Sequence, residues 1–208
     1  MKLKNLMICI LSSLILTACK FEGVTEVHGN GSGTLRSAVG FTAQERQDLE
    51  KRSNGNKDFC NTSQAPLGVT ITEELRGDKT WCVTEVPFDN LKELSSLYEQ
   101  KKGIRVNHLE ISDGNFYYDI EIDTLSETSN FSGFAAITWT VILPGTPTNH
   151  NATHAEGNKL TWQIQTRSGT VNVQAESEVE KSSPNLPCGS ALMISLLLIP
   201  LARRDRRM

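Results

Sequence analysis

The sequence contains few histidines, cysteines and tryptophans. Its 208 residues include 4 histidines, 5 cysteines and 3 tryptophans. No Ser-His-Asp, Cys-His or paired-carboxylate set has a spacing that indicates an active site. Long hydrophobic runs are lacking as well, because the apolar stretches 6–16 and 191–202 are shorter than the span of about 20 residues that crosses a membrane. The sequence therefore favours a non-enzymatic protein with no cofactor and no metal.

The N-terminus has the three parts of an export signal. Lys2 and Lys4 precede the apolar run, and Leu16-Thr17-Ala18-Cys19 closes it with the pattern of a lipobox. Small residues let a signal peptidase reach the backbone, whereas an uncut membrane anchor, the alternative, does not need them before a cysteine. We predict that residues 1–18 are a lipoprotein signal peptide and that Cys19 is lipidated, with acyl chains such as palmitate.

A second membrane signal lies at the C-terminus. The apolar run 191–202 is followed by four arginines, and positive charge after an apolar run indicates a cytoplasmic end. Cys188-Gly189-Ser190 comes before it, so the tail resembles the sorting signals of bacterial surface proteins. Residues 188–208 are predicted to be either a processed sorting tail or a plain C-terminal anchor helix. A linker, 181–187, joins them to the body.

Residues 19–180 are long enough for one extracytoplasmic domain. From Lys20 to Pro187 the chain has 15 basic and 23 acidic residues, a formal balance of −8. An acidic surface argues against nucleic acid as a partner and against electrostatic binding to anionic lipid. We therefore expect membrane attachment through the lipid on Cys19, with the C-terminal helix as a second contact.

Few side chains in this body stand out as ligands. Cys60 and Cys82 suggest a disulfide in an exported domain, which would contribute about 3 kcal/mol by closing a loop of about 22 residues. Free thiols or metal ligands are the alternatives. His150 and His154 lie in a segment typical of strand or turn, and this does not favour a metal site.

Alternating hydrophobicity and turn residues predict an α+β fold: a largely antiparallel sheet built from β-hairpins, with two helices. Thr42 and Glu45 form a capping box before a helix that runs to Arg52. Asp89 is expected to cap a second helix, whose apolar stripe begins at Leu91. Strands are predicted at 23–28, 34–41, 69–75, 79–86, 104–112, 116–122, 133–143, 149–153, 160–166 and 170–175.

The acidic residues of one predicted strand alternate with isoleucines. Asp119, Glu121 and Asp123 are separated by Ile120 and Ile122. This pattern favours an amphipathic strand with a solvated acidic face over a calcium-binding face.

Several short motifs together suggest a family. They are Asn30-Gly31-Ser32-Gly33, Pro87-Phe88-Asp89-Asn90-Leu91, Trp139-Thr140-Val141-Ile142-Leu143-Pro144-Gly145, Asn151-Ala152 and Glu156-Gly157-Asn158-Lys159-Leu160-Thr161-Trp162. With them the body resembles the LppM-type domain of bacterial envelope lipoproteins. The resemblance implies an extracytoplasmic α+β domain, commonly lipid-anchored and with a C-terminal apolar helix, and a likeness to lipid-binding folds. The two body cysteines and the sorting-like tail depart from the family pattern.

Two tryptophans offer the choice between a binding site and a filled core. Trp139 and Trp162 are expected on neighbouring strands, where they can pair across the sheet. They either pack in the core or line a groove for a ligand. A groove would make the protein a membrane-anchored binder of a lipid or another apolar ligand. A filled core would favour a cell-surface interaction or scaffolding protein without a small-molecule ligand.

Overall fold

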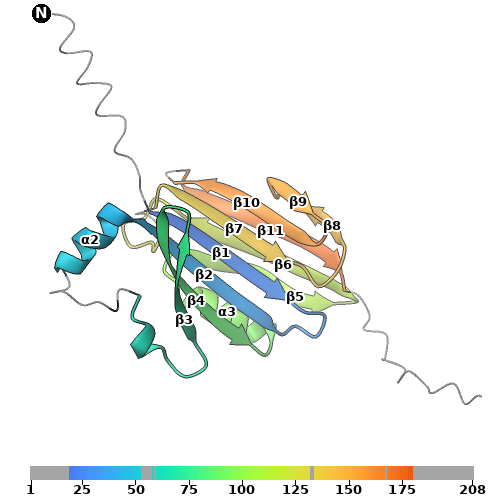
Figure 1. Ribbon diagram of the computed structural model, residues 1–208. Helices are drawn as coiled ribbons and strands as arrows, with labels where there is room; N and C mark the ends of the chain where they lie inside the picture. The colour runs from blue at the N-terminus through green and yellow to red at the C-terminus, as the bar shows by residue number, and fades with distance from the viewer. Residues whose placement is uncertain (1–18, 53–57, 59, 132–133, 167, 180–208) are drawn as a thin grey trace, which may run out of the picture.

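The computed structural model describes residues 19–52, 58, 60–131, 134–166 and 168–179, and Figure 1 shows it as a ribbon. Its elements follow one another as β1 (Lys20–Val27), β2 (Gly33–Thr42), α2 (Ala43–Arg52), η1 (Thr62–Gln64), β3 (Thr70–Arg76), β4 (Lys79–Phe88), α3 (Leu91–Glu99), β5 (Ile104–Ser112), β6 (Asn115–Asp123), β7 (Ala136–Ile142), β8 (Pro147–His150), β9 (His154–Glu156), β10 (Lys159–Gln165) and β11 (Thr170–Glu178).

These strands form two sheets. The first has the order β3-β4-β2-β1-β7-β10-β9, and the second has the order β5-β6-β11-β8. Strands β1 and β7 are parallel, and the other pairs among the described strands are antiparallel. The predicted α+β class, rich in antiparallel pairs and with two α-helices among the described residues, is confirmed. The expectation of a single sheet is wrong, because alternating strands bury one face each and two such faces cover each other.

The core lies between the sheets and under helix α3. Strand β6 shows the pattern, since Phe116, Tyr118, Ile120 and Ile122 are buried while the residues between them are only partly covered. Helix α3 packs on β4 and β5 and inserts Leu94 and Tyr98, both fully buried, into the same cluster. The interior of the described domain is thus filled by apolar and aromatic side chains.

Both helices begin with side-chain caps. At α2 the backbone N–H of Thr42 donates to Glu45 Oε2 over 2.7 Å, and the Glu45 N–H donates to Thr42 Oγ1 over 3.3 Å, so the predicted capping box is confirmed. The predicted cap of the second helix, α3, is wrong by one residue. Asn90 rather than Asp89 caps α3, because Asn90 is extended and its side chain accepts from the Glu93 N–H.

The predicted strand at 149–153 is only partly confirmed, because β8 ends at His150, residues 151–153 belong to no strand, and β9 begins at His154. Strand β8 pairs with β11 in the second sheet, whereas β9 pairs with β10 in the first. Asn151 lies between them, and its Oδ1 accepts from the indole N–H of Trp162 over 2.7 Å and from the Gln174 N–H over 2.9 Å. Since Trp162 and Gln174 belong to different sheets, this side chain marks the corner where the chain passes from one sheet to the other.

The ends of the described chain lie at opposite ends of the sandwich (Figure 1). Strand β1 begins directly at Lys20, beside Gly40 and Ala136. At the other end, Val179 donates to the carbonyl of Gly114, in the turn between β5 and β6. None of the helices within the described residues has the length and apolar character of a membrane span. The predicted signal peptide and the predicted C-terminal anchor or sorting tail lie outside the described residues.

Candidate functional site

The two tryptophans pair across the sheet, and both lie in the core. Trp139 of β7 stands opposite Trp162 of β10, and their side chains are 1% and 3% exposed. Their rings therefore do not line an open groove, and the alternative of core packing holds. The reason is that β7 and β10 direct these residues toward the second sheet, which covers them. The indole N–H of Trp139 donates across the core to Tyr118 Oη over 3.0 Å.

A hydrogen-bonded chain of hydroxyl groups continues from this indole through the core. Tyr98 Oη lies 2.8 Å from Tyr118 Oη and 2.5 Å from Thr25 Oγ1. Burial raises the pKa of both phenols. Each hydroxyl in the chain has a partner, so the network satisfies polar groups that would otherwise be costly to bury. It joins β1, α3, β6 and β7 and has the character of a structural element rather than a reactive one.

The raised phenol pKa values predict a loss of stability in alkaline solution. In the unfolded chain tyrosine ionises near pH 10, whereas folded Tyr98 and Tyr118 keep their protons at that pH. Above about pH 10 the unfolded state therefore binds fewer protons, and the free energy of unfolding falls as the pH rises. Circular dichroism and phenolate absorbance, followed together, should show the two phenolates appearing with unfolding. The double variant Tyr98→Phe/Tyr118→Phe should lose most of this pH dependence; an equal dependence in both proteins would contradict it.

A polar groove of about 360 Å³ lies on the outer face of the second sheet. Residues from β5, β6, β11 and β8, together with Asn151, line it: His108, Tyr117, Tyr118, Asp119, Asn149, His150, Asn151, Gln174, Ala175 and Glu176. Two irregularities in strand register border it, at Val106/His108 and at Glu176/Ser177. Bulges of this kind bend a sheet and redirect its side chains. The concave shape thus follows from the strands themselves.

Several polar side chains of the groove are held in place by one another. Gln174 Nε2 donates to Asp119 Oδ2 over 2.9 Å, and Asn149 Nδ2 donates to Glu176 Oε1 over 3.4 Å. The imidazole of His108 stacks on the ring of Tyr117, with centroids 5.2 Å apart and planes 12° from parallel. The lining contains two carboxylates, amides, imidazoles and the exposed-side phenol of Tyr117, with the buried Tyr118 behind it, but neither lysine nor arginine. It presents hydrogen-bond acceptors on a fixed surface.

Sequence reasoning found only part of this groove. The predicted solvated acidic face is present, since Asp119, Glu121 and Asp123 lie on the partly covered side of β6. The contributions of β11 and β8 were missed, because they depend on pairing between residues 25 or more positions apart. His150 and His154, which are four residues apart, lie on β8 and β9 in different sheets. Within the described residues, no cluster of three or more acidic, histidine or cysteine side chains has the arrangement of a metal site.

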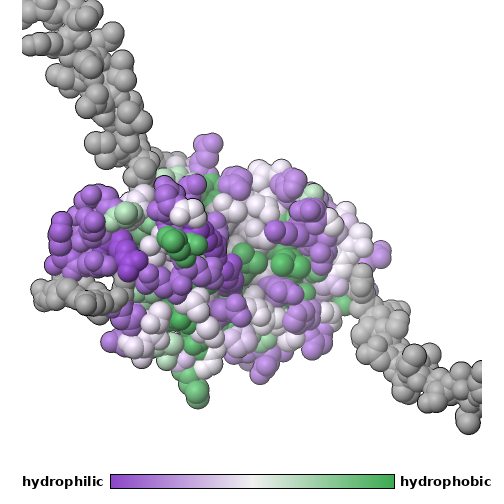
Figure 2. Space-filling view, viewed as in Figure 1, coloured by the Kyte–Doolittle hydropathy of each residue, from purple (hydrophilic) through white to green (hydrophobic). Residues whose placement is uncertain are grey.

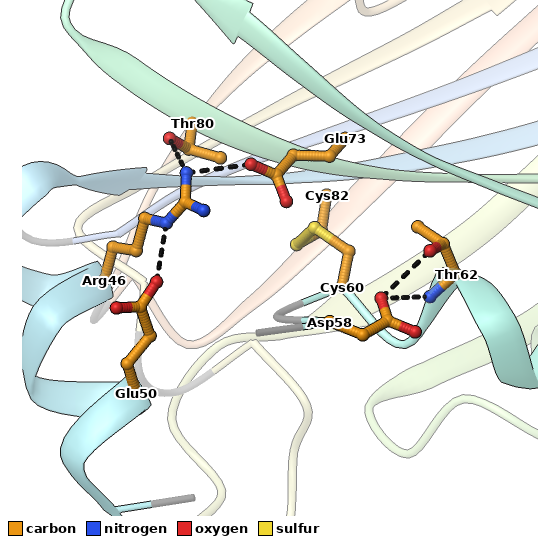
Figure 3. The surroundings of a disulfide bond; sticks show 8 residues. All are labelled: Arg46, Glu50, Asp58, Cys60, Thr62, Glu73, Thr80 and Cys82. Atoms are coloured by element: carbon orange, nitrogen blue, oxygen red, sulfur yellow. Dashed lines mark hydrogen bonds and ion pairs between the residues drawn. A yellow bond between two sulfur atoms is a disulfide. The ribbon is translucent and has the colours of Figure 1, made fainter. Parts of the chain in front are cut away.

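Cys60 and Cys82 form the predicted disulfide (Figure 3). Cys82 lies on β4, and the bond ties to it the segment that leads into η1. Within that segment Asp58 accepts from the backbone N–H and the hydroxyl of both Thr62 and Ser63. These hydrogen bonds, those of Ser63 first, lower the pKa of the Asp58 carboxyl.

Arg46 of α2 links the helix to the two strands beside the disulfide. Its guanidinium donates to Glu50 over 3.0 Å and to Glu73 of β3 over 2.8 Å. It also donates to Thr80 of β4 over 3.3 Å (Figure 3). The helix is thus joined to the sheet edge by polar contacts around the covalent link.

Cys19 is part of the folded domain. Its carbonyl accepts from the Ala135 N–H over 3.1 Å, and the next residue already belongs to β1. Its Sγ lies 3.6 Å from Glu45 Oε1, in the cap of α2. Burial, with the nearby Glu45 carboxylate, raises the pKa of this thiol. A thiol whose pKa is raised is a poor nucleophile, so the setting does not suit catalysis.

No family model and no curated protein matches the sequence. Among solved structures, the fold is similar to the NMR structure of the folded domain of LppM from Mycobacterium tuberculosis. The TM-score is 0.54 at 13% sequence identity, and the match covers 79% of this chain and 92% of that one. The chain has an LppM-like fold. The fold expected from the resemblance in sequence is thus confirmed, and the likeness includes most of the LppM domain.

Proposed function

We propose that this chain is a bacterial envelope lipoprotein, held on the outer side of a membrane by lipid on Cys19, and that it binds a ligand rather than catalysing a reaction. The position of Cys19 carries the proposal. The residue follows the predicted export signal and is the first residue of the described domain, where its carbonyl accepts from the Ala135 N–H. Cleavage before Cys19 would remove the leader and leave the sheet intact.

The attachment is tested by replacing Cys19 with serine. We expect the wild-type protein, expressed in a bacterial host, to incorporate labelled fatty acid and to float with the membranes. The Cys19→Ser protein should incorporate none, because serine does not provide the thiol to which the lipid is joined. Cys60→Ser/Cys82→Ser serves as the matched control, since it removes two other cysteines but leaves the lipobox intact. Labelling of the Cys19→Ser protein at the wild-type level would refute the proposal.

The ligand is proposed to bind in the polar groove rather than between the sheets. The space between the sheets is occupied by side chains such as Trp139, Tyr118 and Leu160, all at most 1% exposed. An acyl chain would have to displace them, at the cost of a well-packed core. The acceptors Asp119 and Glu176 in the groove suit instead a headgroup or another polar molecule rich in hydroxyl or amine donors. The lack of lysine and arginine in the lining disfavours phosphate.

Native mass spectrometry of the protein extracted from its membranes in mild detergent tests this assignment. A bound polar molecule or glycolipid should be present in the wild type and absent from the double variant Tyr117→Ala/Asp119→Asn. Glu85→Gln provides a control, because Glu85 is an exposed acid on the first sheet. A wild-type protein recovered without any bound molecule would favour the alternative of a scaffolding protein, which the filled core also supports.

The second predicted tether, the C-terminal helix, has a limited reach. Residues 180–187 precede it and span at most about 29 Å when fully extended. The ten residues of β2 alone extend over about 33 Å. The described chain ends at the end of the domain that is farthest from Cys19 (Figure 1). If the domain stands upright on the lipid of Cys19, residues 180–187 are therefore too short to bring residue 188 back to the same bilayer. The proposal therefore favours removal of the tail, or its attachment to a different layer, over a double anchor in one membrane.

A further inference from the structure

The end of the sandwich at which Cys19 enters also carries exposed leucines. Lys20 lies opposite Gly40, and the next residue of β2, Phe41, lies opposite Thr80. Thr80 in turn lies opposite Leu75. Phe41, Thr80 and Leu75 therefore form one row across the sheet, and this row is level with Cys19, the residue before Lys20. The Leu75 side chain is 78% exposed.

A second exposed leucine reaches the same end from the other sheet. Leu125, which is 58% exposed, follows the end of β6, where the Thr124 N–H donates to the carbonyl of Gly169. The loop that contains it continues to Ala135, whose N–H donates to the carbonyl of Cys19. We call this end of the sandwich, with Cys19, Leu75, Leu125 and the turns around them, the Cys19 pole.

We propose that the Cys19 pole lies directly on the lipid bilayer, with Leu75 and Leu125 in contact with its interface. This proposal rests on the proposed lipidation of Cys19 and adds an orientation to it. No linker separates Cys19 from the fold, because Lys20 is already paired with strands on both sides. A diacylglyceryl group on Cys19 Sγ would therefore hold the pole at the membrane surface. Leucine side chains are favourable there, because insertion removes apolar surface from water.

Charge does not explain the contact. The exposed Lys20 and Lys102 lie at the Cys19 pole, but so do the exposed Asp78 and Glu127. On the face seen in Figure 2 the apolar residues form small patches separated by hydrophilic ones, and helix α2, which begins beside Cys19, is hydrophilic. What the pole offers a membrane is thus the combination of exposed leucines with the point of lipid attachment. The bilayer that holds the lipid is the occupant that this combination fits.

Leu67 provides a matched control for the orientation. It is fully exposed and lies beyond the other end of β3, eight residues before Leu75 in the chain. A photoreactive benzoylphenylalanine is placed at position 67, 75 or 125 of the full chain, and the protein is recovered from bacterial membranes and reconstituted in phosphatidylcholine vesicles. Crosslinks to phosphatidylcholine should be several-fold more frequent from positions 75 and 125 than from position 67.

Equal crosslinking from all three positions, or more from position 67, would overturn the orientation. The lipid on Cys19 is measured in the same samples by mass spectrometry of its peptide. Unlipidated protein would contradict the proposed function, whereas lipidated protein without crosslinks from positions 75 and 125 would contradict the orientation alone.

In a second measurement, Leu75→Asp/Leu125→Asp should lose the vesicle-dependent protection of the β3–β4 turn from hydrogen exchange, and Leu67→Asp should retain it. Unchanged protection in the double variant would also refute the contact.

Discussion

Replacing Trp139 with alanine is expected to lower the free energy of unfolding by about 3–5 kcal/mol. The indole is 1% exposed and lies between the sheets, with ring centroids 5.9 Å from Tyr98, 6.3 Å from Phe21 and 6.4 Å from Phe131. Truncation would leave a cavity and would remove the donor to Tyr118 Oη. Gly23 of β1 lies directly opposite, with no side chain that could fill the space.

Urea unfolding followed by circular dichroism measures this loss. Trp139→Phe should cost less than the alanine variant, because it keeps most of the ring volume and removes only the hydrogen bond and part of the packing. Leu67→Ala serves as the surface control and should change the free energy of unfolding by at most about 0.5 kcal/mol. An alanine variant at position 139 as stable as the wild type would show that the two sheets do not depend on this side chain.

The local parts of the fold could be predicted because they depend on residues that are close in the sequence. The alternation in 116–122 gave both the strand and its buried side, and Thr42 with Glu45 gave the start of α2. The division into two sheets could not be predicted. It depends on β1 pairing with β7, more than 100 residues away, and on β6 pairing with β11. Alternation defines which side of a strand is buried but does not name its neighbours.

The candidate site shows the same limit. The acidic side of β6 was predicted, but the groove also needs Asn149 and Gln174, and two shifts in strand register that leave no signal in composition. For Trp139 and Trp162, the pairing across the first sheet was predicted, but the second sheet that covers and buries them was not. Cys60 and Cys82 could be paired from the predicted export signal, because a disulfide is favoured in an exported domain that holds two cysteines.

Loss of the disulfide is expected to lower the free energy of unfolding by about 3 kcal/mol on the chain-entropy model. Cys60 and Cys82 are 22 residues apart, and the bond restricts the loop between them in the unfolded chain. In the folded domain it secures the segment around η1 to β4, next to the contacts of Arg46. Asp58 continues to order that segment through Thr62 and Ser63, but these hydrogen bonds are local and do not replace the link to the sheet.

The measurement compares urea unfolding of the wild type with and without a reductant, beside the variant Cys60→Ala/Cys82→Ala. Reduced wild type and variant should share a lower midpoint, because both lack the same constraint. Cys19→Ser should respond to the reductant as the wild type does, since Cys19 takes no part in the bond. If the reductant left the midpoint unchanged while the thiols became reactive, the ordering of Asp58 and residues 60–64 would come from their contacts with β3, β4 and α2. The bond would then report an oxidising compartment without stabilising the fold.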